Sequence, residues 1–97
     1  MSDKPIALAL SDMTLVAIRA EATRAHLLHG DNSMLSKGHT DDRRMSILTE
    51  EVGEAAREIN DAVVEARPID RDKLVKELIQ VAAMAASWVE ALEGGHQ

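Results

Sequence analysis

The sequence predicts an all-α protein, a helical bundle with three main helices in each chain. Apolar residues recur every three or four positions along three long stretches, which is the period of one helix face. Glycine and proline residues separate the stretches, and none of them alternates apolar and polar residues as a strand would. The 97 residues include no Phe, no Tyr and one Trp. Because a core without bulky side chains buries little area, we expect a second copy of the chain to complete a four-helix-type bundle.

The first helical stretch covers residues 3–29, with a break near Ser11 and Asp12. Either of these two residues is a suitable N-cap for the segment that follows. Gly30 comes directly after the stretch, in the position where helices commonly end. Residues 30–40 have no sustained apolar period, so we expect a loop there. Loops of this length in compact domains are often functional or mobile.

A central helix is predicted from about Asp42 to Ala66. Pro68 ends it, because proline disfavours the helical conformation in the residue before it. Three residues at its start can accept hydrogen bonds from the first free N–H groups: Thr40, Asp41 and Asp42. The apolar face of this helix consists of Met45, Leu48, Val52, Ala55, Ile59, Ala62 and Ala66.

A third helix is predicted from Arg71 to Glu93, with Asp70 as its N-cap and residues 94–97 as a flexible tail. The link between the second and third helices is short, so the two should pack antiparallel. The apolar stripe of the third helix consists of Leu74, Leu78, Val81, Ala82, Ala85, Val89 and Leu92. The middle of this helix is apolar on almost all sides, which indicates burial against more than one neighbour.

Composition and charge limit the class of protein. The chain is short enough that residues 1–97 form a single domain. A net charge of −6 argues against a nucleic-acid partner, because phosphate binding needs clustered Lys and Arg. No apolar run is long enough to span a membrane, and the first residues lack the basic region of a signal peptide. We therefore expect a cytoplasmic protein that has no membrane partner.

The acidic residues of the second and third helices show the spacing of a metal site. Glu51 and Glu54 lie one helical turn apart, as do Glu77 and Gln80. If the two helices pair antiparallel, these side chains can face one cleft and supply oxygen ligands. An all-oxygen set without Cys or converging His favours Mg²⁺, with Mn²⁺ also possible. On spacing alone, a solvated surface with salt bridges is the more common arrangement of such acids.

Gly53 lies between the paired acids of the central helix. A glycine inside a helix costs about 1 kcal/mol relative to alanine. Its presence indicates close approach of a neighbouring helix or of a ligand at this point.

The run Glu50-Glu51-Val52-Gly53-Glu54-Ala55, followed by Glu77-Leu78-Ile79-Gln80, resembles the MazG-like family of all-α nucleoside triphosphate pyrophosphohydrolases. That family carries Glu-Glu-x-x-Glu on one helix and Glu-x-x-Asp on the next. The resemblance covers about residues 13–93 and extends to a branch of small members in which Gln is usual in place of the Asp. It implies a MazG-like bundle that works as a homodimer or homotetramer.

The resemblance also implies an activity and a ligand set. Family members convert an NTP or dNTP and water to the monophosphate and pyrophosphate, a reaction that serves nucleotide-pool housekeeping. Carried over by position, the metal ligands are Glu51, Glu54, Glu77 and Gln80, and the catalytic acids are Glu50, Glu51 and Glu54. Gln80 departs from the family Asp and supplies one neutral oxygen, so a metal should bind more weakly or the site should hold one ion fewer.

Three further residues are weaker candidates for substrate binding. Lys73 can meet the departing pyrophosphate, Trp88 can stack on a base, and His29 can touch base or phosphate. Each also has an ordinary alternative: a solvated lysine, a core or interface tryptophan, and a solvent-exposed or capping histidine.

Two other functions fit the same residues. A phosphoribosyl-ATP pyrophosphohydrolase belongs to the same superfamily, but the chain lacks the Gly- and Lys-rich lead-in of that family. A noncatalytic helical dimer that binds nucleotide or a protein partner is the alternative from a different class. Gln80 is the residue that makes this alternative worth testing.

Overall fold

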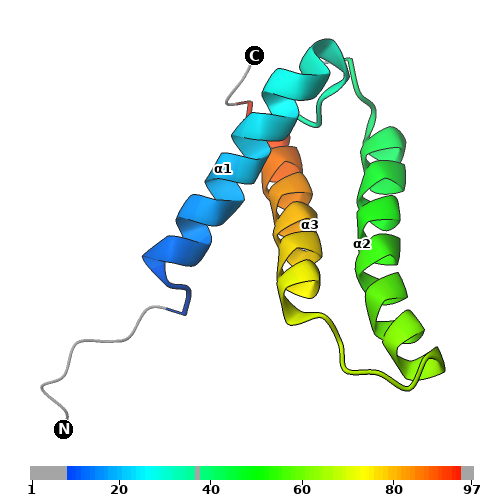
Figure 1. The fold of residues 1–97 in the computed structure, drawn as a ribbon. Coiled ribbons are helices and arrows are strands. Elements are labelled where there is room, and N and C mark those ends of the chain that lie inside the picture. The colour runs from blue at the N-terminus through cyan, green and yellow to red at the C-terminus, as the bar shows by residue number, and fades with distance from the viewer. Residues whose placement is uncertain (1–8, 37, 95–97) are drawn as a thin grey trace, which may run out of the picture.

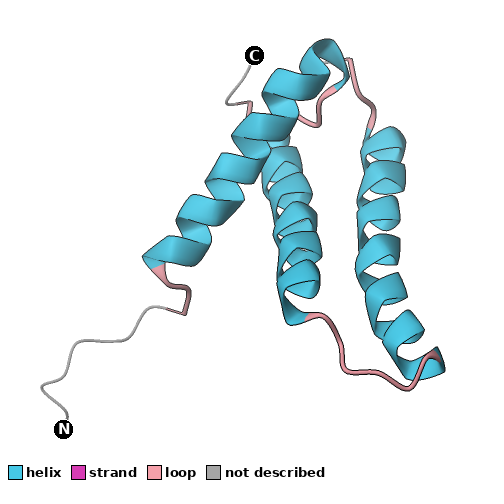
Figure 2. Ribbon diagram, in the orientation of Figure 1, coloured by secondary structure: helices cyan, strands magenta, loops and turns pink. Residues whose placement is uncertain are grey.

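The computed structural model describes residues 9–36 and 38–94, and within these ranges the chain is all-helical. Helix α1 covers Asp12–His29, the short 3₁₀ helix η1 covers Gly30–Asn32, α2 covers Asp41–Val64 and α3 covers Arg71–Leu92 (Figure 1). Loops connect these helices and no strand is present in the described ranges (Figure 2). The all-α prediction is confirmed. The predicted helical residues 3–8 and the tail residues 95–97 lie outside the described residues.

Each helix begins at an N-cap that is among the candidates predicted from the sequence. Ser11 accepts the backbone N–H of Thr14 at 3.2 Å and begins α1. Thr40 caps α2 in the same way through the N–H of Arg43, at 3.3 Å. Asp70 caps α3 through the N–H of Lys73, at 3.1 Å. These side chains satisfy donors that have no partner inside the helix.

The central helix ends two residues earlier than predicted. It stops at Val64 rather than Ala66, because Ala66 adopts a φ of 52°, which is incompatible with a right-handed helix. The N–H of Arg67 then bonds to the carbonyl of Ala62 at 3.0 Å, which satisfies an acceptor at the helix end. Gly30 also has a positive φ of 52° and ends α1 as predicted.

Helix α3 is the central element, because it contacts both α1 and α2. It runs antiparallel to α2, as the short link predicts, while α1 crosses it at an angle (Figure 1). The core where these elements meet consists of Ala25, Met34, Ala83 and Met84, with Ile18, Ala22, Ile47, Leu48 and Trp88 packed against it. No large side chain among the described residues is fully buried. None of the described helices combines the length and the apolarity that crossing a membrane requires.

The buried face of α3 within one chain is not the apolar stripe that the periodicity predicts. Leu78, Val89 and Leu92 of that stripe are more than half exposed. The buried residues of α3 are instead Ala83, Met84 and Ser87. The Ala-rich middle of the helix is apolar on several faces, so periodicity could not decide which face meets α1 and α2.

The loop between η1 and α2 is anchored by one side chain from α2 and one from the loop itself. Arg44 is buried, and its guanidinium donates to the carbonyls of Met34 and Ser36 at 2.9 and 2.7 Å. The ring of His39, also buried, lies 2.6 Å from the carbonyl of Asn32. These bonds place the loop against the core at the end of the bundle where α1 ends and α2 begins.

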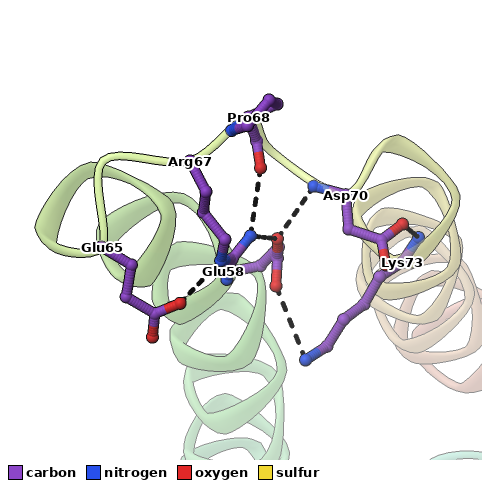
Figure 3. A network of polar contacts seen from close by, with 6 residues as sticks. All are labelled: Glu58, Glu65, Arg67, Pro68, Asp70 and Lys73. Atoms are coloured by element: carbon purple, nitrogen blue, oxygen red, sulfur yellow. Dashed lines mark hydrogen bonds and ion pairs between the residues drawn. The ribbon is translucent and has the colours of Figure 1, made fainter.

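The turn between α2 and α3 is organised by one buried carboxylate, Glu58 (Figure 3). Glu58 is 3% exposed and accepts hydrogen bonds from Arg67 and from the backbone N–H of Asp70, each at 3.0 Å. The ammonium group of Lys73 lies 3.5 Å from its other oxygen. A buried charge is tolerated when it is paired and hydrogen-bonded in this way.

Replacing Glu58 with Gln should lower the melting temperature by several degrees at neutral pH. The hydrogen bond from Arg67, followed by that from the N–H of Asp70, lowers the pKa of Glu58 below its ordinary value of 4.5. The stabilisation is therefore present above that value and is lost as pH falls through the lower folded pKa. Thermal melts of the protein and of Glu58→Gln should converge in acid. Asp61→Asn, on the exposed side of α2, is the control, and equal melting temperatures for all three proteins would contradict the prediction.

Candidate metal centre

Three carboxylates converge where the middle of α2 faces α3. Glu51 and Glu54 lie on one edge of α2, and Glu77 lies on the facing edge of α3. One carboxylate oxygen from each residue lies within 4.8 Å of the other two. The antiparallel packing thus brings the three acids to one place.

Two of these acids carry an oxygen that has neither solvent nor a partner. Oε2 of Glu51 and Oε2 of Glu77 are buried and have no hydrogen-bond partner. A buried carboxylate oxygen without a donor is costly. Glu54 is exposed, so the site opens to solvent on its side. A hard divalent cation coordinated by these oxygens would supply the missing partner, and the all-oxygen donor set fits Mg²⁺ or Mn²⁺.

The electrostatics of the cluster agree with this geometry. Burial raises the pKa of Glu51, and the negative charges of Glu54 and Glu77 raise it further. Glu21 of α1 and Glu50, the exposed neighbour of Glu51, contribute in the same direction. Without a cation, therefore, the ionised form of Glu51 is destabilised by the negative charges around it.

A cavity of about 360 Å³ reaches the acidic cluster at Glu51 and is bordered by all three helices. Glu51 and the half-buried Gln80 line it from α2 and α3. His29, exposed at the end of α1, lines the same cavity. Two predicted ligands and one predicted substrate contact thus share one cavity.

The other two predicted substrate contacts are engaged elsewhere and do not line this cavity. Lys73 is paired with Glu58 in the turn between α2 and α3. The indole N–H of Trp88 donates to the carboxylate of Asp41 at 3.0 Å, and its ring packs against the core. The packing of Trp88 matches the core alternative stated for it, whereas Lys73 is ion-paired with a buried acid rather than simply solvated.

Residues of α1 and of the first turn of α2 also line the cavity, and sequence reasoning did not select them. Glu21 and Arg24 form an ion pair at 2.6 Å, and the hydrogen bond from Arg24 lowers the pKa of Glu21. Arg43 lines the cavity from α2. The spacing of Glu21 and Arg24 indicates a local pair within one helix, but no local pattern places α1 beside Glu51.

No protein-family model matches the chain, and no curated protein or solved structure is significantly similar to it. The functional assignment therefore depends on the geometry of the acids and on the motif resemblance.

Replacing Glu51 with Gln should stabilise the metal-free protein at neutral pH. Because the folded pKa of Glu51 lies above its ordinary value of 4.5, the free energy of unfolding falls as pH rises from that value through the folded pKa. The variant lacks this loss, so its melting temperature should lie above that of the unmodified protein. Mg²⁺ should raise the melting temperature of the unmodified protein and have less effect on the variant.

Thermal melts with and without Mg²⁺ measure both effects, and Asp61→Asn again serves as the control. A variant less stable than the parent in the absence of metal would show that Glu51 has a structural partner instead.

Proposed function

We propose that this protein is a Mg²⁺-dependent nucleoside triphosphate pyrophosphohydrolase that converts an NTP or dNTP and water to the monophosphate and pyrophosphate. The observation that supports the proposal is the convergence of Glu51, Glu54 and Glu77, two of which carry buried oxygens without a partner. The motif resemblance links this arrangement to nucleotide hydrolysis. Such an activity would serve nucleotide-pool housekeeping in the cytoplasm.

In this proposal the three acids hold Mg²⁺. Glu51 and Glu77 use the oxygens that are buried without a partner, and Glu54 contributes from the open side. Gln80 contributes a neutral amide oxygen at most. When bound, Mg²⁺ neutralises charge on the triphosphate and on the departing pyrophosphate.

The hydrolytic step requires a base beside the α-phosphorus. Glu50 is exposed next to Glu51, and Glu54 is exposed one turn further along α2. One of these two carboxylates orients a water molecule and accepts its proton as the oxygen bonds to the α-phosphorus. The bond from that phosphorus to the α–β bridging oxygen breaks, and pyrophosphate leaves with the electron pair.

A noncatalytic role in binding nucleotide or a protein partner is the second candidate. Gln80 favours it, because an amide cannot replace the charge of the family Asp. Phosphoribosyl-ATP pyrophosphohydrolase activity is a third possibility, which a substrate panel separates from the first.

The proposal includes a homodimer or homotetramer. An apolar seam, half-buried at its two alanines, runs along α3 with alternating spacings of three and four residues; it is formed by Val75, Leu78, Ala82, Ala85, Val89 and Leu92. Val75, Leu78, Val89 and Leu92 are each more than half exposed. This is the spacing by which helices pair in coiled coils, and the two alanines allow close approach. A second copy packed on the seam would complete the bundle.

Purified protein should release pyrophosphate from at least one nucleotide in a panel of NTPs, dNTPs and phosphoribosyl-ATP with Mg²⁺ or Mn²⁺. Glu51→Gln and Glu54→Gln should each reduce the rate about 100-fold or more, because each removes a negative ligand of the Mg²⁺ that would neutralise the reacting phosphates. Asp61→Asn, on the same helix but outside the cluster, should retain activity. Binding of nucleotide with no release from any member of the panel would instead support the noncatalytic role.

Leu78→Glu should shift the protein toward monomer, because the substitution places a charge in the middle of the seam. Analytical ultracentrifugation over a range of protein concentrations measures the assembly state. Arg71→Glu introduces the same acid at the exposed start of α3, outside the seam, and should leave assembly unchanged. A parent protein that sediments as a monomer at every concentration would refute this part of the proposal.

A further inference from the structure

The cavity beside the acids has a floor and a rim of different chemistry. Its floor includes Ala25, Met34 and Met84, which are all buried residues of the apolar core. Its rim includes His29, Asn32 and Arg43, which are all exposed. The volume of about 360 Å³ lies within the range of pockets that hold small organic molecules.

The floor suits the face of a flat ring. Met34 and Met84 come from the loop and from α3 and meet in the core cluster. Thioether side chains adapt to irregular shapes and make favourable contacts with aromatic rings. An apolar floor of this kind does not bind a phosphate group, which needs positive charge and hydrogen-bond donors.

The rim suits the polar edge of the same kind of ring. The Asn32 amide offers both donors and an acceptor, and the His29 ring offers one of each when neutral. Arg43 forms no ion pair with another described residue, so its donors are available to a ligand. Arg24 also lines the cavity, but Glu21 already holds its charge.

We propose that this cavity binds the base and sugar of a nucleotide, with Met34 and Met84 against the base and Asn32 and Arg43 at its polar edge. The identification of the ligand rests on the proposed function. Glu51 belongs to both the cavity and the acidic centre, and Gln80 lines the cavity as well, so a nucleotide seated here directs its phosphates toward the acids. Trp88 is then not a stacking partner, because Asp41 holds its N–H and it packs against the cluster from outside the cavity.

Trp88 provides a direct readout, because it is the only Trp in a chain without Tyr or Phe. It packs against the cluster that contains Met34 and Met84. Occupation of the cavity should therefore change its fluorescence, even without metal and without turnover. Titration with nucleosides and nucleoside monophosphates in the absence of Mg²⁺ should give a saturable change for at least one base.

Two rim substitutions with matched controls test the location. Asn32→Ala and Arg43→Gln should each weaken nucleoside monophosphate binding about tenfold. The backbone carbonyl of Asn32, which meets His39, is retained in the first variant. Asn60→Ala and Arg57→Gln alter the same residue types at exposed positions of α2 outside the cavity and should bind as the parent does.

The outcomes separate this inference from the proposed function. Nucleoside binding that depends on Asn32 and Arg43, together with no pyrophosphate release, would support the cavity and reject the enzyme. Pyrophosphate release whose KM is unchanged in both rim variants would reject nucleotide binding in this cavity and would still support the proposed enzymatic activity. A fluorescence change with inorganic triphosphate but with no nucleoside would identify a phosphate site and overturn the inference. Circular dichroism melts establish that each variant is folded.

Discussion

The arrangement of the α2–α3 interface depends on whether the carboxylates buried in it have hydrogen-bond donors or cations beside them. Near the turn, Glu58 is buried and fully partnered, with Arg67, Lys73 and the N–H of Asp70 around it. Further along the same interface, Glu51 and Glu77 each bury an oxygen that no donor meets. One pair of helices thus contains a satisfied acid and an unsatisfied cluster. The first is a structural ion-pair network, and the second is the cluster for which we propose a divalent cation as the missing partner.

The two features also depend on each other. The bonds to Glu58 hold the turn between α2 and α3, and the antiparallel packing that results aligns Glu77 with the acids of α2 (Figures 1 and 3). At the other end of the bundle, Arg44 and His39 hold the segment between α1 and α2, which carries Asn32 and Met34. The acids and the adjoining cavity therefore lie between two anchored connections. Such support limits movement of the side chains that would meet a ligand.

The small size of the core bears on both function and assembly. Met34, Met84 and several alanines form most of it, and the seam of α3 is left exposed. A small core contributes little stabilisation to the folded chain. Association with a second copy would add to it, because the partner would bury apolar side chains that intramolecular packing leaves in water. In the same way, a divalent cation would remove repulsion that the protein by itself does not relieve. The proposed metal and the proposed second copy would each compensate for a deficiency of the single chain.

The sequence by itself determined the three helices, the N-cap Asp70 and the acids that could share a turn, because these follow from interactions over a few residues. It narrowed the other two N-caps to neighbouring candidates, from which the structure selects Ser11 and Thr40. Tertiary structure alone decided which face of α3 is buried and that α1 brings Glu21 and Arg24 to the cavity. It also decided that Lys73 pairs with Glu58 and that Trp88 donates to Asp41. Periodicity could not predict these features, since an Ala-rich helix offers several equivalent faces and contacts between distant segments leave no local pattern. The spacing of Glu51, Glu54 and Glu77 could suggest a shared site, but only the packed helices show that two of their oxygens are buried without partners.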